Sequence, residues 1–179
     1  ALNSSVPTTQ IIKFFQNNPP ITAGGMQNYL RALIASGQTA QAMQTLKNWW
    51  PKAFLAPNDQ DMIIDQFGQY LGSQDHERRL RHIIYDQHYT ASRRLAEILG
   101  YGYPELVEAK IGLIEEKPNV NALITRVPAS LKNNEALMLA RIQWRRKNGY
   151  DGGAIDLLNK APSYNRLSNP DAWWRQRHI

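Results

Sequence analysis

The chain has 179 residues, of which 42% are hydrophobic, so it can bury a core as one domain or as an array of repeats. Its formal net charge of +6 favours an anionic partner such as nucleic acid, a membrane surface or an acidic cell-wall polymer. The absence of cysteine excludes disulfides and thiolate chemistry, and no apolar run approaches the roughly 20 residues of a membrane-spanning helix.

Apolar residues recur at helical spacing from the start of the chain, and no segment alternates like a strand. The successive apolar groups are Ile11, Phe14, Phe15; Met26, Tyr29, Leu30, Leu33; Ala42, Met43, Leu46, Trp49, Trp50; Ile63, Phe67, Tyr70, Leu71; Leu80, Ile83, Ile84; Leu95, Ile98, Leu99; Leu106, Ala109, Leu113; and Val120, Leu123, Ile124, Val127. The spacing predicts an all-α fold of about eleven short helices.

The breaks between these groups carry residues that end and restart helices. Glycine is expected in left-handed C-cap positions at Gly37, Gly72, Gly100 and Gly149. Side chains that accept hydrogen bonds from the first turn of a helix are expected at Thr39, Ser73, Thr90, Asn133 and Asn169. Short helices joined by short turns pack antiparallel to their neighbours.

A degenerate repeat favours a solenoid over a bundle. Small residues follow turns at Ala42, Ser92, Ala122 and Ala154, and the last three lie 30 and 32 residues apart. This spacing is close to a helix-turn-helix repeat of about 34 residues, in which a small side chain lets paired helices approach. We therefore predict an irregular α-solenoid, or superhelix, of hairpins like those of tetratricopeptide repeats, as a single domain over residues 1–179.

The two ends predict that the sequence is part of a longer chain. The start at Ala1 has neither an initiator methionine nor the apolar core of a signal peptide. A new helix begins at Asn169, with Pro170 and Asp171 in its first turn, yet the sequence stops at Ile179. A helix shorter than about 12 residues is marginal alone.

Arginines gather beside the apolar groups, at Arg78 and Arg81, at Arg145 and Arg146, and at Arg177. They could line one edge of a superhelix and contact an acidic polymer. They could equally be the solvated faces of amphipathic helices, with their aliphatic stems covering apolar surface.

Trp173 and Trp174 invite a sugar-stacking interpretation, because an aromatic face suits the apolar face of a pyranose. Core packing is the favoured alternative, since one of two adjacent tryptophans on a helix usually faces inward. His76, His82 and His88 recur every six residues, which scatters them around a helix, so we predict no metal site.

Catalytic motifs are lacking in the sequence. Glu105, Glu108, Glu115 and Glu116 fit ordinary helix surfaces, and their spacing suggests no pair of carboxylates for glycoside cleavage. The sequence has no phosphate-binding loop, dinucleotide motif or zinc-protease motif. We predict no catalytic residue and no cofactor in this chain.

Five segments taken in order resemble the superhelical region of bacterial soluble lytic murein transglycosylases, and the closing Trp-Trp-x-x-Arg element is the most telling. The segments are Gly72–Leu80, Ala91–Leu95, Arg126–Pro128, Ala140–Gly149 and Asn169–Arg177. The resemblance implies a periplasmic location, and a U-shaped or ring-like superhelix that holds peptidoglycan glycan strands and supports a separate lysozyme-like catalytic domain.

In that family the catalytic domain cleaves the β-1,4 bond between MurNAc and GlcNAc and leaves 1,6-anhydromuropeptides. Its Glu-Ser stretch and glycine-rich segment are absent here, so the resemblance implies a non-catalytic scaffold within an enzyme that is itself catalytic. Weak contacts with glycan strands are expected at Arg78, Arg81, Arg145, Arg146, Trp173, Trp174 and Arg177.

A different class of function stays open at the sequence level. The chain could be a tetratricopeptide-like adapter whose concave face binds a partner protein. Nucleic-acid binding through the arginines is a third hypothesis, which predicts an affinity that falls steeply with salt, but no nucleic-acid partner is expected.

Overall fold

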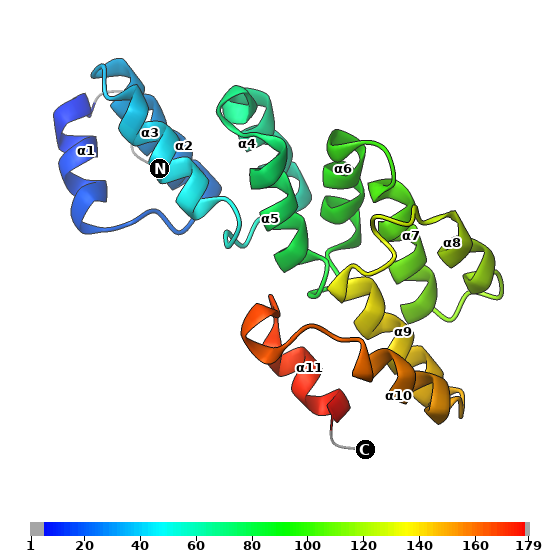
Figure 1. Ribbon diagram of the computed structural model, residues 1–179. Helices are drawn as coiled ribbons and strands as arrows, with labels where there is room; N and C mark the ends of the chain where they lie inside the picture. Colours follow the sequence, from blue (N-terminus) through cyan, green and yellow to red (C-terminus); the bar gives the residue numbers. More distant parts are fainter. Residues whose placement is uncertain (1–5, 178–179) are drawn as a thin grey trace. The chain divides into compact units, whose positions relative to one another are not determined.

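The computed structural model describes residues 6–177 and confirms the all-α prediction (Figure 1). Within this range it contains eleven α-helices, two short 3₁₀ helices and no strand. The α-helices are α1 (Thr8–Asn17), α2 (Ala23–Ala35), α3 (Thr39–Trp49), α4 (Pro57–Phe67), α5 (Ser73–Ile83), α6 (Tyr89–Leu99), α7 (Tyr103–Ile114), α8 (Val120–Arg126), α9 (Glu135–Lys147), α10 (Asp151–Asn159) and α11 (Pro170–Arg177). The 3₁₀ helices are η1 (Gly68–Tyr70) and η2 (Tyr164–Arg166). None of these helices is long and apolar enough to cross a membrane.

Contacts within the chain divide it into two compact units, residues 1–79 and residues 80–179, and the division falls inside α5. We describe each unit by itself. The prediction of a single domain over residues 1–179 stays a prediction, as do the expectations for Ala1 and for the end at Ile179, which lie outside the described residues.

In the first unit, α2 packs against α1, α3 and α4. Figure 1 shows α1, α2 and α3 as neighbouring helices at the blue end of the chain. The apolar face of α2 is fully covered, with Met26 and Leu30 each 1% exposed and Leu33 at 0%. This face forms the centre of the unit, because α2 is the one helix that the three others share.

The second unit is built around two longer helices. Helix α7 packs against α6, α8 and α9, and α9 packs in turn against α10 and α11. Leu106, Leu113, Val120 and Leu137 belong to a core cluster of α7, α8 and α9. Trp173 joins a second cluster with residues of α9 and α10, so α9 contributes to both cores.

The predicted caps are right in part. Gly37, Gly100 and Gly149 adopt positive φ angles of 75°, 78° and 76°, as a left-handed helix end requires, and Gly72 does not. The Asn169 carboxamide oxygen accepts a hydrogen bond from the Ala172 backbone N–H at 3.1 Å, which confirms that cap. The cap predicted at Asn133 is one residue later, at Asn134.

Three of the predicted caps are displaced because the helices start earlier than expected. Thr39 and Ser73 are the first residues of α3 and α5, and Thr90 lies inside α6. At the start of α5 it is the Asp75 carboxylate that accepts the Gly72 backbone N–H, at 2.9 Å. The acid in the first turn thus bonds back to the residue that precedes the helix, as the acidic member of a capping box does.

Two apolar side chains of the predicted core are instead exposed. Phe14 is 52% exposed and Ile98 is 47% exposed, although both follow the helical spacing. In α1 the residues that are buried are Ile12 and Phe15. Spacing identifies the apolar face of a helix, but the width of the face that is covered depends on its neighbours.

The small-residue repeat holds at three of its four positions. Ala42, Ser92 and Ala154 are buried, with exposures of 2%, 1% and 0%, as close helix approach requires. Ala122 is exposed, so its assignment to the repeat was wrong. Helix α8 has only seven residues and is covered through Val120 rather than through Ala122.

Candidate functional site

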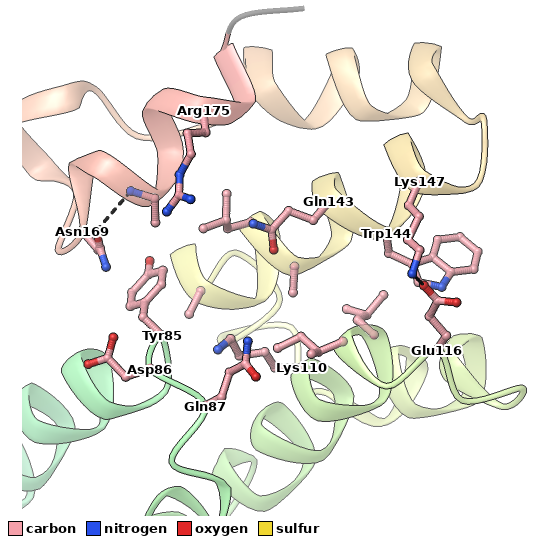
Figure 2. A pocket seen from close by; sticks show the side chains of 16 residues that line it. Tyr85, Asp86, Gln87, Lys110, Glu116, Gln143, Trp144, Lys147, Asn169 and Arg175 are labelled. Atoms are coloured by element: carbon pink, nitrogen blue, oxygen red, sulfur yellow. Dashed lines mark hydrogen bonds and ion pairs between the residues drawn. The ribbon is translucent and has the colours of Figure 1, made fainter.

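The second unit contains a pocket of about 390 Å³ (Figure 2). Its lining residues come from the connection between α5 and α6, from α7 and the turn after it, from α9, and from α11 and the residue before it. A cavity of this size is within the range of small-molecule sites. We regard it as the best candidate site because an unusual charged residue, Lys110, lies in its wall.

Lys110 is buried in the middle of α7, with 4% of its surface exposed. Its ammonium lies 5.6 Å from the centre of the Tyr85 ring. Among residues 6–177 it makes no hydrogen bond and no ion pair. Burial lowers the pKa of Lys110 to about 8, and the charge of Asp86 partly opposes that shift.

The burial of Lys110 follows from the position of α7 in the unit. Most of the circumference of this helix is covered, including Leu106, Val107, Ile111 and Leu113. A helix covered to this extent leaves a buried cationic side chain few routes to bulk water, and a cavity is one of them. The pocket is therefore where the Lys110 ammonium can meet solvent or a ligand.

Tyr85 provides the aromatic ring whose centre lies 5.6 Å from the Lys110 ammonium. Its hydroxyl oxygen accepts a hydrogen bond from Trp173 Nε1 at 3.5 Å. Burial raises the pKa of Tyr85 well above its usual value, and the charge of Glu135 acts in the same direction. Tyr85 is consequently a neutral phenol throughout the physiological range, and its ring can contact the cation of Lys110.

Arg175 brings a second cation to the pocket from α11. Trp173, which is fully buried, packs this helix against the core cluster of α9 and α10, and Asn169 caps its first turn. Figure 2 shows Arg175 pointing inward from α11, with Lys110 extending from α7 toward Tyr85. The two cations therefore reach the pocket from different helices.

The lining of the pocket contains both cations and carboxylates, and most of these charges offset one another. Lys147 forms an ion pair with Glu116, and Asp86 lies on the loop after α5. The lining thus has three cations, Lys110, Lys147 and Arg175, and two carboxylates, Asp86 and Glu116, which leaves an excess of one positive charge. Gln143 and Asn169 add neutral amides to the lining.

The arginines predicted to contact glycan are not gathered in this pocket. Arg78 belongs to the first unit, where it forms an ion pair with Asp75 while its side chain is 52% exposed. Arg81 is exposed and lines a more open concavity of about 640 Å³ with Lys160 and Arg166. Both side chains are exposed to solvent.

The other predicted arginines bond within the chain. Arg145 donates to the Gly153 carbonyl, Arg146 donates to Gln176 Oε1 at 3.0 Å, and Arg177 donates to the Pro162 carbonyl at 3.2 Å. Arg145 and Arg146 are half-buried. Their aliphatic stems therefore cover helix surface, in agreement with the structural alternative considered from the sequence.

The two terminal tryptophans have different environments. Trp173 is 0% exposed and Trp174 is 56% exposed. Glycan contact by Trp173 is excluded by its burial, because a fully covered ring offers no face to a sugar. Trp174 is exposed, so of the two tryptophans it is the one to which the prediction of a glycan contact still applies.

The carboxylates considered from the sequence are mostly paired with cations. Glu108 bonds Arg93, Glu115 pairs with Lys117, and Glu116 pairs with Lys147. Of the residues that the structure describes, no three His, Asp or Glu side chains form a group that could hold a metal. The pocket lining contains two carboxylates, Asp86 and Glu116, and Glu116 is the one paired with Lys147.

Sequence reasoning missed Lys110, Tyr85 and Gln143 as site residues. A signal for Lys110 is present, because it lies four residues after Leu106 and three before Leu113, on the same helix face as both. A lysine within an apolar stripe must either reach the surface or be buried. The sequence offers no comparable signal for Tyr85, whose role depends on contacts with distant residues.

Comparisons with protein families, with curated proteins and with solved structures find no match to this chain.

Proposed function

We propose that this chain is a non-catalytic helical scaffold of a lytic murein transglycosylase, acting in the periplasm and making weak contacts with peptidoglycan glycan strands. The observation that carries the proposal is the ordered series of five segments that resemble this family. The all-helical fold of the described residues supports it, because the family's scaffold region is built from short paired helices.

The segments that carry the resemblance hold structural positions in this chain. Arg79, in the first segment, is 1% exposed and bonds the backbone carbonyls of Trp50 and Ala53. Val127 is 1% exposed and Trp173 is fully buried. A resemblance made of core residues and caps supports a shared fold more than a shared active site.

The exposed candidates for glycan contact are Arg78, Arg81 and Trp174. Arg81 is the most favourable of the three, because it shares its concavity with Lys160 and Arg166. A concave basic surface suits a polymer that carries carboxylates. In the parent enzyme, the cleavage of the MurNAc-GlcNAc bond would belong to the separate catalytic domain.

Cosedimentation with purified sacculi tests the proposal. The chain should bind sacculi weakly and release no anhydromuropeptides. Replacing Arg81 with glutamine should reduce the bound fraction, whereas Arg126→Gln, an exposed arginine at the end of α8, should not. Binding that is undetectable at any protein concentration would refute glycan contact, and release of anhydromuropeptides by this chain would refute the non-catalytic role.

A tetratricopeptide-like adapter is the second candidate, and the helical pairs within each unit favour it. An adapter should bind a partner protein saturably and be indifferent to glycan. A third outcome, affinity for nucleic acid that falls steeply with salt, would replace both proposals.

A further inference from the structure

We propose that the pocket formed by α7, α9 and α11 binds an organic carboxylate with an apolar substituent, and that Lys110 and Arg175 hold its carboxylate group. The inference depends on the pocket alone and holds whether or not the chain is part of a peptidoglycan enzyme. It concerns a site separate from the exposed arginines discussed above.

Lys110 gives the first reason. A buried ammonium normally has a carboxylate or several carbonyl oxygens around it, because leaving a charge unpaired in a protein interior is costly. Lys110 has neither among residues 6–177, only the face of the Tyr85 ring at 5.6 Å. Its nearest counter-charge is Asp86, which lies beyond ion-pair distance. An anion in the pocket would supply the missing partner.

The charge of the lining gives the second reason. The excess of one positive charge matches a single carboxylate, while the carboxylates of Asp86 and Glu116 oppose a dianion such as phosphate. Arg175 can offer two parallel N–H groups to the two oxygens of a carboxylate. The amides of Gln143 and Asn169 supply further donors in the same lining.

The apolar part of the lining gives the third reason. Leu113, Ile114, Leu139, Ala140 and Trp144 contribute to the pocket wall beside the charged groups. Leu113, Leu139 and Ala140 are already covered by the protein, and the half-buried Ile114 and Trp144 are the apolar residues that an aliphatic substituent would cover. The ligand class is therefore a carboxylate attached to an apolar group of a few carbon atoms.

Isothermal titration calorimetry with N-acetylleucine tests the proposal, and N-acetylleucine amide is the uncharged control. The acid should bind and the amide should bind at least about tenfold more weakly, since the amide lacks the charge that Lys110 and Arg175 would bond. A tripeptide that ends in leucine tests whether the carboxylate can come from a peptide terminus. Inorganic phosphate tests the alternative anion.

Two variants locate the site. Arg175→Gln removes an exposed charge of α11, and Lys110→Met keeps the length of the buried side chain without its charge. Each should weaken binding of N-acetylleucine about tenfold or more, whereas Arg126→Gln should bind as the unmodified chain does. If Lys110→Met does not fold, the Arg175→Gln result alone decides.

Binding of N-acetylleucine or of the tripeptide supports the proposal if that binding is lost in Arg175→Gln. The acid that binds more tightly shows whether the carboxylate comes from a small molecule or from a peptide terminus. No binding of either acid, equal binding of the amide, binding unchanged in Arg175→Gln, or binding of phosphate alone would each overturn it.

Discussion

At the scale of single residues, two buried cations behave in opposite ways. Arg79 is 1% exposed, and its guanidinium donates to Gln60 Oε1 at 2.8 Å and to the carbonyls of Trp50 and Ala53 at 2.7 and 3.0 Å. It also lies 4.4 Å from the centre of the Trp50 ring. Lys110 is buried to a similar degree without such partners, and it lies in the wall of a pocket, so we infer a structural role for Arg79 and a binding role for Lys110.

Replacing Arg79 with methionine should destabilise the chain by about 2–4 kcal/mol, because the Gln60 side chain and two buried carbonyls would lose their donor. Urea unfolding measures the change. The control is Lys13→Met, an exposed cation of the same unit, which should change stability by less than about 0.5 kcal/mol. Equal effects of the two substitutions would contradict the structural role of Arg79.

Lys110 predicts a pH dependence of stability. Its pKa is about 8 in the folded chain, below the ordinary lysine value of 10.5, so between these values the unfolded chain binds more protons. Stability should therefore rise with pH through this window. Between pH 8 and pH 10 the rise from this residue should be about 2 kcal/mol.

The comparison that isolates this effect is with Lys110→Met, which lacks the titrating group. The measurement stops at pH 10. Above that pH the unfolded chain loses the Tyr85 proton while the folded chain keeps it, because the pKa of Tyr85 is raised, and stability falls as pH rises. Urea unfolding at each pH should give a flatter profile for the variant. Identical slopes in the two proteins would show that Lys110 is not desolvated in the folded chain.

At the scale of elements, the turn between α6 and α7 depends on backbone freedom and close packing. Gly102 has a positive φ of 88°, and a Cβ at this position would lie 2.7 Å from Pro128 Cγ and 3.0 Å from Leu131 Cδ1. The turn thus packs directly against the segment that follows α8. This contact lies at the start of α7, the helix that carries Lys110.

Gly102→Ala should lower stability by at least about 2 kcal/mol, since it adds a steric clash to the backbone strain. Gly149→Ala is the matched control, because Gly149 has a φ of 76° with nothing within 4 Å of the added carbon. That variant should cost only about 1 kcal/mol. Thermal unfolding measures both, and equal losses would mean that the clash is relieved by movement of Pro128.

At the scale of the whole molecule, the boundary between the two units falls inside α5. Arg79 ends the first unit, and its partners Trp50, Ala53 and Gln60 all belong to that unit. Helix α5 is therefore needed to complete the first core. Dividing the chain before α5 would remove the bonds that Arg79 makes with these three residues.

A fragment of residues 6–88 should consequently be more stable than a fragment of residues 6–72, which lacks α5. Circular dichroism during heating compares them. Introducing Arg79→Met into the longer fragment should remove part of its advantage, because the advantage depends on the bonds of that guanidinium. Equal melting temperatures of the two fragments would contradict this dependence.

The helices were predictable because they are encoded locally. The apolar groups around Leu30, Leu46 and Leu95 are buried as their spacing predicts, and Gly37, Gly100 and Gly149 end helices. Ala122 was assigned wrongly because the repeat is degenerate, and α8 is too short to bury a second face. The burial of Arg79 was not predicted, since its partners are 19 to 29 residues away in the sequence.

The helical class, most of the buried faces and the burial of one tryptophan at 173 and 174 can be read from the amino-acid order, because they depend on the 3.6-residue period and on the large area of the indole. The burial of Lys110 without a partner, beside a pocket, is visible only in the folded chain. That outcome depends on contacts among α7, α9, α11 and Tyr85, which no local spacing encodes. The physical reason is that burial of a charge is set by all the elements around it, whereas a helix is set mainly by its own residues.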